Sequence, residues 1–197
     1  MSNEKHGPAD HEVVSFDNEA LILVNDRDEQ IGSMSKALAH DGDGVLHRAF
    51  SLFIFDDSGR LLLQRRSAAK RLWPLYWSNS CCSHPRDGET MEVATMRRLE
   101  QELGIRTRLE FVYKFTYRAE FDDAGSENEI CSVYLGRCDT KPRVNETEIA
   151  EWRFVSTAEL EQEFIDRPYL FTPWFKLEWR RLSREFQERL AAYTDAV

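Results

Sequence analysis

The sequence lacks the marks of several large protein classes. It has no run of about 18 apolar residues, which a membrane-spanning helix needs. The polar first 19 residues contain no apolar segment of the signal-peptide kind. Acidic residues outnumber basic ones by 35 to 26, and the net charge of -9 disfavours a nucleic-acid or anionic-membrane surface. We therefore expect a soluble cytoplasmic protein whose partner is neither a nucleic acid nor a membrane.

Cysteine is scarce, and the four that occur do not have the spacing of a zinc ribbon. Cys81 and Cys82 are adjacent, whereas Cys131 and Cys138 stand too far apart to form a metal knuckle. In a reducing cytosol we expect all four to be thiols rather than disulfides. A structural zinc site on sulfur is therefore disfavoured, and the thiols remain available for chemistry.

Length and composition predict one domain. A chain of 197 residues with 42% hydrophobic residues is long enough to bury a full core. No internal repeat or low-complexity segment divides it. We expect residues 1–19 to form a disordered N-terminal tail and residues 20–197 to form the single domain.

The order of predicted elements is mixed, which favours an α+β fold. Residues 47–55 and 60–66 flank a turn-forming Asp-Asp-Ser-Gly segment and predict a hairpin. Residues 67–88 have no clean period and predict a long functional loop. The other expected strands cover residues 21–24, 111–121, 130–138 and 151–155. The expected helices cover residues 37–39 after Ser35, 90–103 before Gly104, 157–164 after Ser156, and a long segment from Pro173 to residue 193.

Residues 77–85 are the strongest candidate for chemistry. Cys82 stands two residues before His84, so a thiol that can transfer a proton or attack carbon adjoins an imidazole that can hold a metal. Basic residues at positions 65, 66, 70 and 71 precede this segment and suit an anionic, phosphorylated ligand. The thiol alone leaves a nucleophile, a redox site and a metal ligand open.

Three histidines and two glutamates make a candidate metal site. Glu127 and Glu129 stand at i and i+2, so a strand would point both carboxylates to one face. His40, His47 and His84 are the histidines outside the predicted tail, and with the carboxylates they suit an octahedral site for manganese, magnesium or zinc. Taken singly these residues are weak evidence, because a lone histidine is usually structural and a pair of glutamates is usually solvated.

The predicted helix over residues 90–103 resembles a degenerate Nudix box, a motif of Nudix hydrolases. The alternative interpretation is an amphipathic helix with incidental charge. Arg98 and Gln101 stand where the box has two glutamates that bind the magnesium of the hydrolases, so the resemblance speaks against pyrophosphate hydrolysis. The positions that keep the spacing of the box are Ser83, Glu89, Arg97, Glu102 and Gly104.

Beyond the box, the chain resembles the type I isopentenyl-diphosphate isomerases over nearly its whole length after residue 20. The matching segments are residues 39–40, 46–51, 65–66 with Lys70, 73–74 with 77–85, 127–129 and 173–174. The resemblance implies a Nudix-like α/β/α sandwich with a mixed sheet. It also implies an enzyme of isoprenoid biosynthesis that interconverts isopentenyl and dimethylallyl diphosphate by moving a proton, and it favours a monomer whose partner is the small diphosphate substrate.

The resemblance also assigns roles to residues. Cys82 is similar to the essential thiol, expected to act as a thiolate base, and Glu129 with Tyr117 is similar to the acid-side pair. Trp174 suits stabilisation of a carbocation by its indole face, worth roughly 0.5 to 2 kcal/mol. The implied diphosphate contacts are Lys36, Arg66, Lys70 and Arg98. The implied ligands of one Mn2+, Mg2+ or Zn2+ are His40, His47, His84, Glu127 and Glu129, with Glu102 as ligand of a second Mg2+ bound with the diphosphate.

Two other functions remain as alternatives. The chain could be a Nudix-type hydrolase of a nucleotide or another diphosphate, or a non-catalytic domain with a structural metal. Several residues also have plain interpretations: Trp174 as core, Tyr117 as an ordinary strand aromatic, and Arg66 and Lys70 as a solvated basic patch. A hydrolase would need the two missing glutamates and has no use for a thiol, whereas the isomerase needs Cys82 and Glu129.

Overall fold

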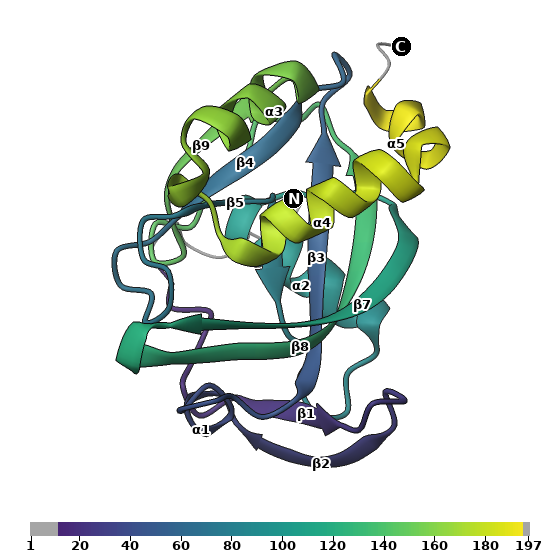
Figure 1. Cartoon of the computed structure of the whole chain (residues 1–197). Coiled ribbons are helices and arrows are strands. Elements are labelled where there is room, and N and C mark those ends of the chain that lie inside the picture. The colour runs from purple at the N-terminus through teal and green to yellow at the C-terminus, as the bar shows by residue number, and fades with distance from the viewer. Residues whose placement is uncertain (1–11, 195–197) are drawn as a thin grey trace, which may run out of the picture.

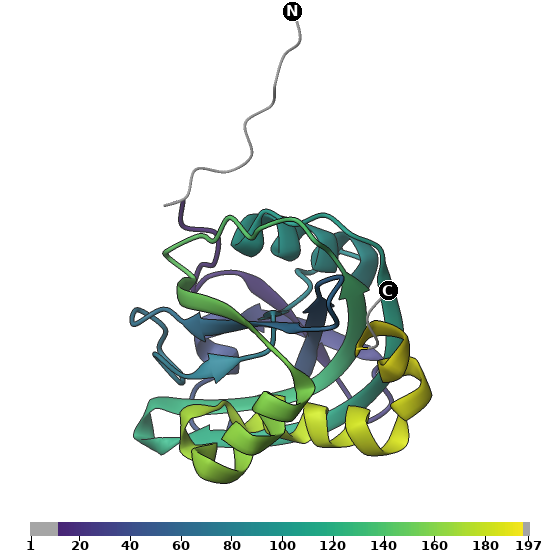
Figure 2. The same cartoon turned by 90° about the horizontal axis from the view of Figure 1, so that it is seen from above.

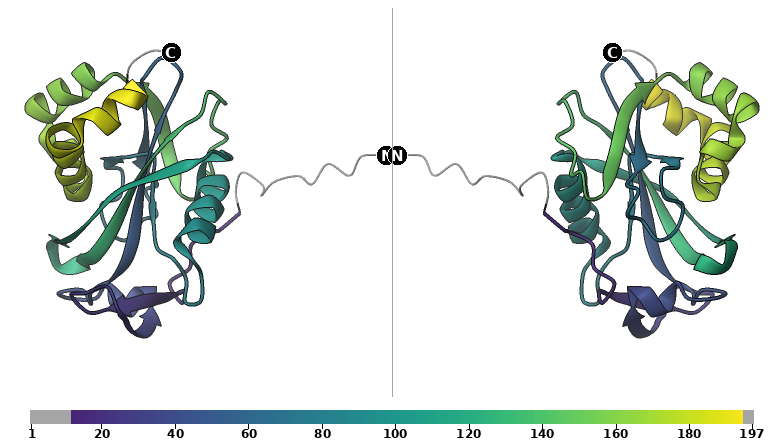
Figure 3. Two further views of the ribbon diagram at one scale, coloured as in Figure 1. Left: turned by 90° about the vertical axis from the view of Figure 1, so that its right-hand side faces the viewer. Right: turned by 90° about the vertical axis from the view of Figure 1, so that its left-hand side faces the viewer.

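The computed structural model describes residues 12–194, which form a mixed sheet between two layers of helices. Helix α2 (Met91–Leu103) covers one face, and α3 (Thr157–Asp166), α4 (Pro173–Glu185) and α5 (Gln187–Thr194) cover the other (Figures 2 and 3). This arrangement confirms the predicted α+β sandwich. Within residues 12–194 no helix is long and apolar enough to cross a membrane.

The strands and the remaining helices are labelled in Figure 1 where there is room. The first six strands are β1 (Ala20–Val24), β2 (Gln30–Ser35), β3 (His47–Phe55), β4 (Leu61–Arg66), β5 (Trp77–Ser78) and β6 (Cys81–Ser83). The last three are β7 (Leu109–Phe121), β8 (Gly125–Arg137) and β9 (Ile149–Val155). The short helices are α1 (Lys36–Ala39), η1 (Asp122–Ala124) and η2 (Pro168–Leu170).

Strand β3 is the central strand of the sheet and is buried on both faces. Its alternating side chains divide between two apolar clusters, because neighbouring residues of a strand point to opposite faces. Phe53 and Phe55 belong to the larger cluster, which lies under α3, α4 and α5. Leu52 and Ile54 belong to the second cluster, with the apolar face of α2. The same alternation positions the polar residues of β3, described below.

The predicted hairpin of β3 and β4 forms only at its turn. The two strands pair at Phe55 and Leu61 and then separate, with β6 and β8 pairing with β3 and β5 and β9 pairing with β4. Ser80 holds the separated strands: its hydroxyl donates to the carbonyl of Leu62 at 2.7 Å and accepts from the amide of Ile54 at 2.8 Å. Part of the predicted loop over residues 67–88 therefore consists of short strands between β3 and β4.

Strands β7 and β8 form a long antiparallel pair that carries Glu127 and Glu129. The connection between them is shorter than the predicted strand bounds of 111–121 and 130–138 imply, because η1 ends at residue 124 and β8 begins at Gly125. Gly125 has φ 132°, and a Cβ there would lie 2.2 Å from the carbonyl oxygen of His40. Only glycine permits this approach of β8 to the segment that follows α1.

The predicted helices are present, with one break. The Thr90 hydroxyl caps α2 and Gly104 ends it at φ 64°, while Ser156 and Glu159 form a capping box on α3. The predicted C-terminal helix is interrupted at Phe186, whose backbone leaves the helical region and separates α4 from α5. Strand β2 was not predicted, because its residues are mostly exposed and show no clear apolar alternation.

The predicted tail of residues 1–19 lies partly outside the described part of the chain, which begins at residue 12. Val14 is only 3% exposed, and its carbonyl accepts a hydrogen bond from Arg98 at 2.7 Å. The carbonyl of Glu12 accepts another from Asn145 at 2.7 Å. These contacts join the end of the predicted tail to the domain, and the boundary at residue 20 stays a prediction.

Candidate active site

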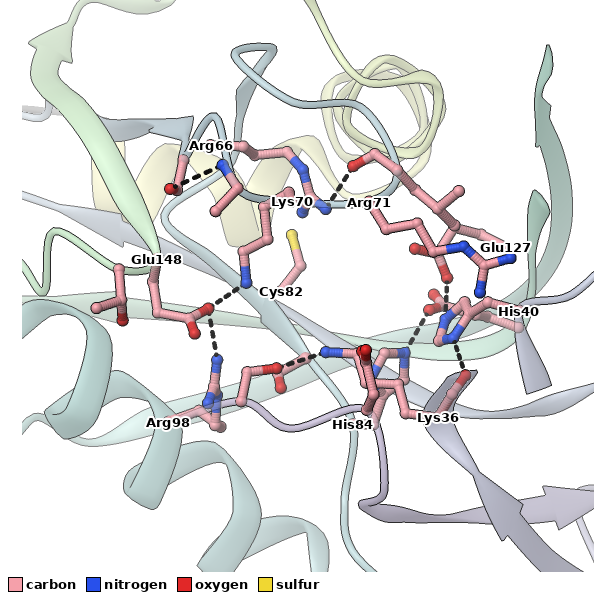
Figure 4. Close-up of a pocket in the computed structure, with 18 of the residues that line it drawn as sticks. Lys36, His40, Arg66, Lys70, Arg71, Cys82, His84, Arg98, Glu127 and Glu148 are labelled. Atoms are coloured by element: carbon pink, nitrogen blue, oxygen red, sulfur yellow. Dashed lines mark hydrogen bonds and ion pairs between the residues drawn. The ribbon is translucent and has the colours of Figure 1, made fainter. Parts of the chain in front are cut away.

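One cavity of about 620 Å³ gathers most of the predicted site residues. In the view of Figure 4, Lys70, Glu148 and Arg98 lie at one end and His40 and Glu127 at the other, with Cys82 between them. Of the predicted residues, His47 and Glu102 alone do not line it, although His47 contacts its wall through Glu129. The structure therefore brings cations, a thiol and carboxylates into one space.

The sheet register explains why the reactive groups share a face. Residues directly opposite one another on paired strands point to the same side of a sheet. In β3, His47 pairs with Glu129 of β8, and Ser51 pairs with Cys82 of β6. Glu129 is also opposite Tyr117 of β7. Because His47 and Ser51 are four residues apart on one strand, the thiol, the phenol and the carboxylate all face the layer of α4.

The five predicted metal ligands converge. Their candidate ligand atoms lie within 4.8 Å of one another, and the three imidazole rings have centroids 4.8 to 5.3 Å apart. The Nε2 atom of His40 lies 2.8 Å from Oε2 of Glu127, and Nε2 of His84 lies 2.9 Å from Oε1 of Glu129. Residues of β3 and β8 and the residues that directly follow α1 and β6 therefore meet at one point although the sequence separates them.

Main-chain carbonyls fix the tautomers of two of these histidines. Nδ1 of His40 donates to the carbonyl of Lys36, and Nδ1 of His47 donates to the carbonyl of Val45, each at 2.7 Å. A carbonyl can only accept, so in a neutral ring the lone pair is on Nε2, which faces the group. Burial, together with His47 and His40, lowers the pKa of His84 well below its ordinary value and keeps the His84 ring neutral.

The residues present fit a divalent metal ion. Nε2 of His40, Nε2 of His47 and Oε2 of Glu127 are buried and have no hydrogen-bond partner. The 2.8 Å contact between His40 and Glu127 lacks hydrogen-bond geometry, because both atoms aim at the same space. Buried polar atoms are normally satisfied, so three unsatisfied ones around a single point indicate a missing shared partner. Neutral imidazole and carboxylate together are a ligand set for such an ion.

Glu129 is one of the five converging ligands and also forms a hydrogen-bonded pair with Tyr117. Its Oε2 accepts a hydrogen bond from the Tyr117 hydroxyl at 2.6 Å, and both side chains are buried. Burial opposes ionisation of Glu129, but the nearby His47 and the hydrogen bond from Tyr117 lower its pKa below the ordinary value. Burial and the Glu129 carboxylate raise the pKa of Tyr117 well above that of a free phenol. The single proton between them is therefore on Tyr117.

The thiol of Cys82 has several polar contacts, and within residues 12–194 no cationic side chain donates a hydrogen bond to it. Its sulfur donates to Oδ1 of Asn79 at 2.7 Å and accepts from the indole nitrogen of Trp174 at 3.2 Å. Burial, with a contribution from the Glu178 carboxylate, raises the pKa of Cys82 to about 12. The sequence analysis expected a thiolate, whereas this environment favours the neutral thiol.

Trp174 begins α4 and is both core and cavity wall. It is 3% exposed and lies against Trp73, with ring centroids 5.1 Å apart. Its ring centroid is also 6.3 Å from that of Tyr117. Trp174 therefore fits both interpretations given above. Its ring packs against Trp73 as part of the core, and its indole N-H donates to Cys82 in the cavity.

The predicted diphosphate contacts all line the cavity, but they are not equally free. Arg98 donates to Glu102 at 2.6 Å and to Glu148 at 3.0 Å, and Lys70 forms an ion pair with the same Glu148. Burial and the neighbouring cations Lys70 and Arg98 lower the pKa of Lys36 to about 8. The cationic side chains of Lys36, Lys70 and Arg98 surround a single carboxylate, that of Glu148, and this excess of positive charge suits an anionic ligand with several charges.

Arg66 differs from the other cations because its guanidinium supports a strained loop. It donates to the carbonyls of Leu72 and Trp73 at 2.9 and 3.1 Å. Trp73 and Leu75 have φ values of 46° and 62°, which non-glycine residues rarely adopt. Arg66 also lies over the Trp174 ring at 5.3 Å from its centroid. The structure thus places Arg66 at the cavity and gives it a role in shaping the wall.

Two residues near Cys82, namely Glu102 and Cys81, do not line the cavity. Glu102 is buried on α2, where it holds Arg98, and is outside the group of five converging ligands. Its predicted role as ligand of a second magnesium stays a prediction. Cys81 is fully buried in the cluster under α2 and, by the alternation of β6, points away from Cys82.

Sequence reasoning missed four polar residues that contact the predicted ones. Glu148 and Asn79 gave no signal, because each is one polar residue in an irregular segment. Glu178 did give one: it lies on the buried face of α4 with Trp174 and Trp179, so a charged residue interrupts the apolar stripe. Ser51 likewise interrupts the apolar residues of β3 on the cavity side.

Comparisons with known proteins agree with this geometry. The NUDIX domain family model matches residues 45–175. An isopentenyl-diphosphate Delta-isomerase 1 from Photorhabdus laumondii is 39% identical over 87% of this chain and 99% of its own. An isopentenyl-diphosphate Delta-isomerase from Serratia proteamaculans is 42% identical over 88% of this chain and 97% of its own.

Solved structures show the same fold. The crystal structure of DR0079 from Deinococcus radiodurans superposes with a TM-score of 0.63 at 25% identity, covering 76% of this chain and 90% of that one. A MutT protein from Methanosarcina mazei Go1 superposes at 0.60 with 19% identity over 72% of this chain and 96% of its own, which shows the fold alone. On the match of the family model and the identity to its relatives, the chain belongs to the isopentenyl-diphosphate Delta-isomerase family of NUDIX-domain proteins.

Proposed function

We propose that this protein interconverts isopentenyl diphosphate and dimethylallyl diphosphate, a step of isoprenoid biosynthesis, by a metal-dependent proton transposition. The observation that carries this is the placement of Cys82 and Glu129 on one face of the sheet, on opposite edges of β3, in one cavity. Moving a double bond requires a proton to be added at one carbon and removed at another. Cys82 and Glu129, on either side of one cavity, can perform these two proton transfers.

Binding of the diphosphate falls to the cationic end. Lys36, Lys70 and Arg98 offer charge and donors there, and Arg66 completes the wall. Binding energy at this remote group can align the alkene, which has no polar handle of its own. The Mg2+ that accompanies the diphosphate would meet this end of the cavity, where the carboxylate of Glu102 lies next to Arg98.

We assign the proton donor to the pair of Tyr117 and Glu129. An alkene is a very weak base, so its protonation needs an acid held against the carbon in a site that excludes water. Both side chains are buried and joined by a hydrogen bond of 2.6 Å. A Mn2+, Mg2+ or Zn2+ ion held by His40, His47, His84, Glu127 and Glu129 would supply positive charge that fixes Glu129 and favours release of the proton that Tyr117 donates to it.

Cys82 takes the other proton. Its raised pKa makes the anion a strong base, which suits removal of a proton from carbon but requires the thiol to be deprotonated first. Trp174 donates its indole N-H to the sulfur, and its ring can stabilise positive charge on the substrate by roughly 0.5 to 2 kcal/mol.

Turnover in deuterated water tests this function. With isopentenyl diphosphate and a divalent metal, dimethylallyl diphosphate should form and carry deuterium. Cys82→Ala and Glu129→Gln should each lower the rate by about 10² to 10⁴-fold, the usual contribution of a positioned acid or base. Cys138→Ala, a thiol outside the cavity, should keep the wild-type rate. Release of phosphate or pyrophosphate without rearrangement would refute the proposal.

A further inference from the structure

Thr172 stands at the start of α4 and is 0% exposed, and the proposed function gives it no role. The hydroxyl of an N-cap residue normally accepts from the first turn of its helix, as Thr90 does for α2 and Ser156 for α3. The Thr172 hydroxyl makes no such bond. It lies instead 3.0 Å from the hydroxyl of Ser78 on β5. A contact with the segment that leads to Cys82 thus replaces the helix cap.

The hydroxyl of Ser78 continues a chain of hydrogen bonds to the reactive thiol. Ser78 is buried, and its hydroxyl donates to Oδ1 of Asn79 at 3.0 Å. A serine hydroxyl has one proton, so Thr172 is the donor in its contact with Ser78. Oδ1 of Asn79 also accepts from the thiol of Cys82 at 2.7 Å, while the Asn79 amide nitrogen donates to two main-chain carbonyls. Asn79 therefore links the position of Ser78 to that of the sulfur.

The chain of hydrogen bonds closes into a ring at α4. The sulfur of Cys82 accepts from the indole N-H of Trp174 at 3.2 Å, and Trp174 follows Thr172 by two residues. Cys82 and Trp174 line the cavity, whereas Thr172, Ser78 and Asn79 do not. These three residues can therefore affect a bound substrate only through the thiol and the indole.

The main chain already attaches α4 to β5 without any hydroxyl. The amide of Thr172 donates to the carbonyl of Trp77 at 2.9 Å, and Phe171 forms a parallel bridge with Trp77. These contacts do not need the Thr172 hydroxyl, so they hold the two segments together when it is removed. The ring adds a narrower constraint, because each hydrogen bond is strong only over a small range of distance and angle. It determines where the indole of Trp174 lies relative to Cys82.

We propose that Thr172 and Ser78 are positioning residues that set the separation between the Trp174 indole and the Cys82 sulfur. The inference rests on the proposed isomerase function and deepens it, because Cys82 takes the proton there and Trp174 stabilises the cation. A misplacement of about 1 Å at reacting groups can lower a rate about 10²-fold. Loss of one bond of the ring, with the main-chain contacts intact, should allow a smaller displacement and cost about 10-fold.

Thr172→Val tests the inference, since valine keeps the shape of the side chain but removes the hydroxyl. The kcat should fall about 10-fold with KM within about twofold, because the diphosphate contacts are unchanged. Thr172→Ser keeps the hydroxyl and should have a kcat within about twofold of wild type. Thr95→Val is the matched control and should keep the wild-type kcat. Thr95 is 2% exposed on α2, its hydroxyl donates to the carbonyl of Glu92 at 3.1 Å, and it does not line the cavity.

The indole N-H of Trp174 gives a second measurement that needs no turnover. NMR spectra of protein with isotope-labelled tryptophan report on the five indole N-H groups, and the signal absent from Trp174→Phe identifies Trp174. This signal should move in Thr172→Val, because the hydrogen bond to the sulfur changes in length. It should keep its position in Thr172→Ser and Thr95→Val.

Ser78→Ala opens the ring at a different bond and serves as an independent test should Thr172→Val fail to fold. It should lower kcat at constant KM and move the Trp174 signal. A wild-type kcat in either variant overturns the inference, as does an unmoved Trp174 signal or a loss of kcat that Thr172→Ser shares. Absence of dimethylallyl diphosphate with the wild type would refute the proposed function instead, while the Trp174 signal would still report whether the ring positions the indole.

Discussion

Glu148 should stabilise the fold and at the same time oppose binding of the diphosphate. Its carboxylate is 3% exposed and forms ion pairs with Lys70 and Arg98, so it occupies the place of an anionic ligand. We therefore expect Glu148→Gln to have two effects of opposite sign: a lower free energy of unfolding and a higher affinity for inorganic pyrophosphate. A neutral amide leaves both cations available to the ligand.

The size of the first effect follows from the pKa of Glu148. Burial opposes ionisation, but Lys70 and Arg98 lower this pKa from 4.5 to about 2. A shift of that size corresponds to roughly 3 kcal/mol of stability near neutral pH. For a domain of this length such a loss lowers the melting temperature by about 6 to 12 °C. Arg98 keeps Glu102 as a partner, which places the loss at the lower end of the range for broken buried pairs.

The stability that Glu148 contributes depends on pH in a defined direction. Because the folded-state pKa is depressed, the contribution of Glu148 is fully present above pH 4.5 and is lost as pH falls towards about 2. The stability difference between wild type and Glu148→Gln, measured by urea unfolding, should therefore shrink over that window. Glu151→Gln is the control, since its ion pair with Arg65 is on the surface and is worth less than about 1 kcal/mol.

Calorimetric titration with pyrophosphate and Mg2+ measures the second effect. The dissociation constant should fall several-fold in Glu148→Gln and stay unchanged in Glu151→Gln. A Glu148→Gln protein as stable as the wild type at pH 7 would show that Lys70 and Arg98 do not depend on this carboxylate. Weaker pyrophosphate binding would show that Glu148 helps to hold the ligand, and the reasoning above would be refuted.

Three further predictions concern the metal group and the thiol. Saturating the group with a divalent ion at 100 times its dissociation constant should raise the unfolding free energy by about 2.7 kcal/mol, and chelation should reverse this; an unchanged melting temperature would argue against a bound ion. Gly125→Ala should destabilise the protein and weaken metal binding by displacing His40, whereas Gly32→Ala on β2, with open space around it, should leave metal titrations unaltered. Trp174→Phe keeps a ring but removes the donor to Cys82, so kcat should fall about 3- to 10-fold at constant KM; a wild-type kcat would remove the hydrogen bond from the mechanism.

Of the five candidate metal ligands, the two glutamates were predictable from a local pattern in the sequence. Glu127 and Glu129 stand at i and i+2 in a strand, which directs both to one face whatever the rest of the fold does. The histidines come from three other elements, and no local pattern brings them together. They were grouped because they are the histidines outside the predicted tail, the resemblance to a family implied the same set, and the convergence of all five side chains agrees with it.

The splitting of the predicted hairpin could not be predicted in the same way. The alternation in β3 and β4 and the turn between them are local and correct, but they do not determine how far the pairing runs. That depends on Ser80, which bonds to Ile54 and Leu62 from elsewhere in the chain. Long-range hydrogen bonds of a single hydroxyl have no signature in a sequence.

The adjacent cysteines show how strictly this part of the sheet must be in register. A slip of one residue in a strand moves every side chain to the opposite face. In β6 such a slip would place Cys81 in the cavity opposite Ser51 and send Cys82 to the cluster under α2, exchanging two identical groups. Asn79 prevents this, since its amide donates to the carbonyls of Leu52 and Cys81 while its oxygen accepts from Cys82. A buried side chain that bonds to both strands fixes which thiol faces the substrate, so Asn79→Ala should cost activity through mispositioning of Cys82 even where the fold is retained.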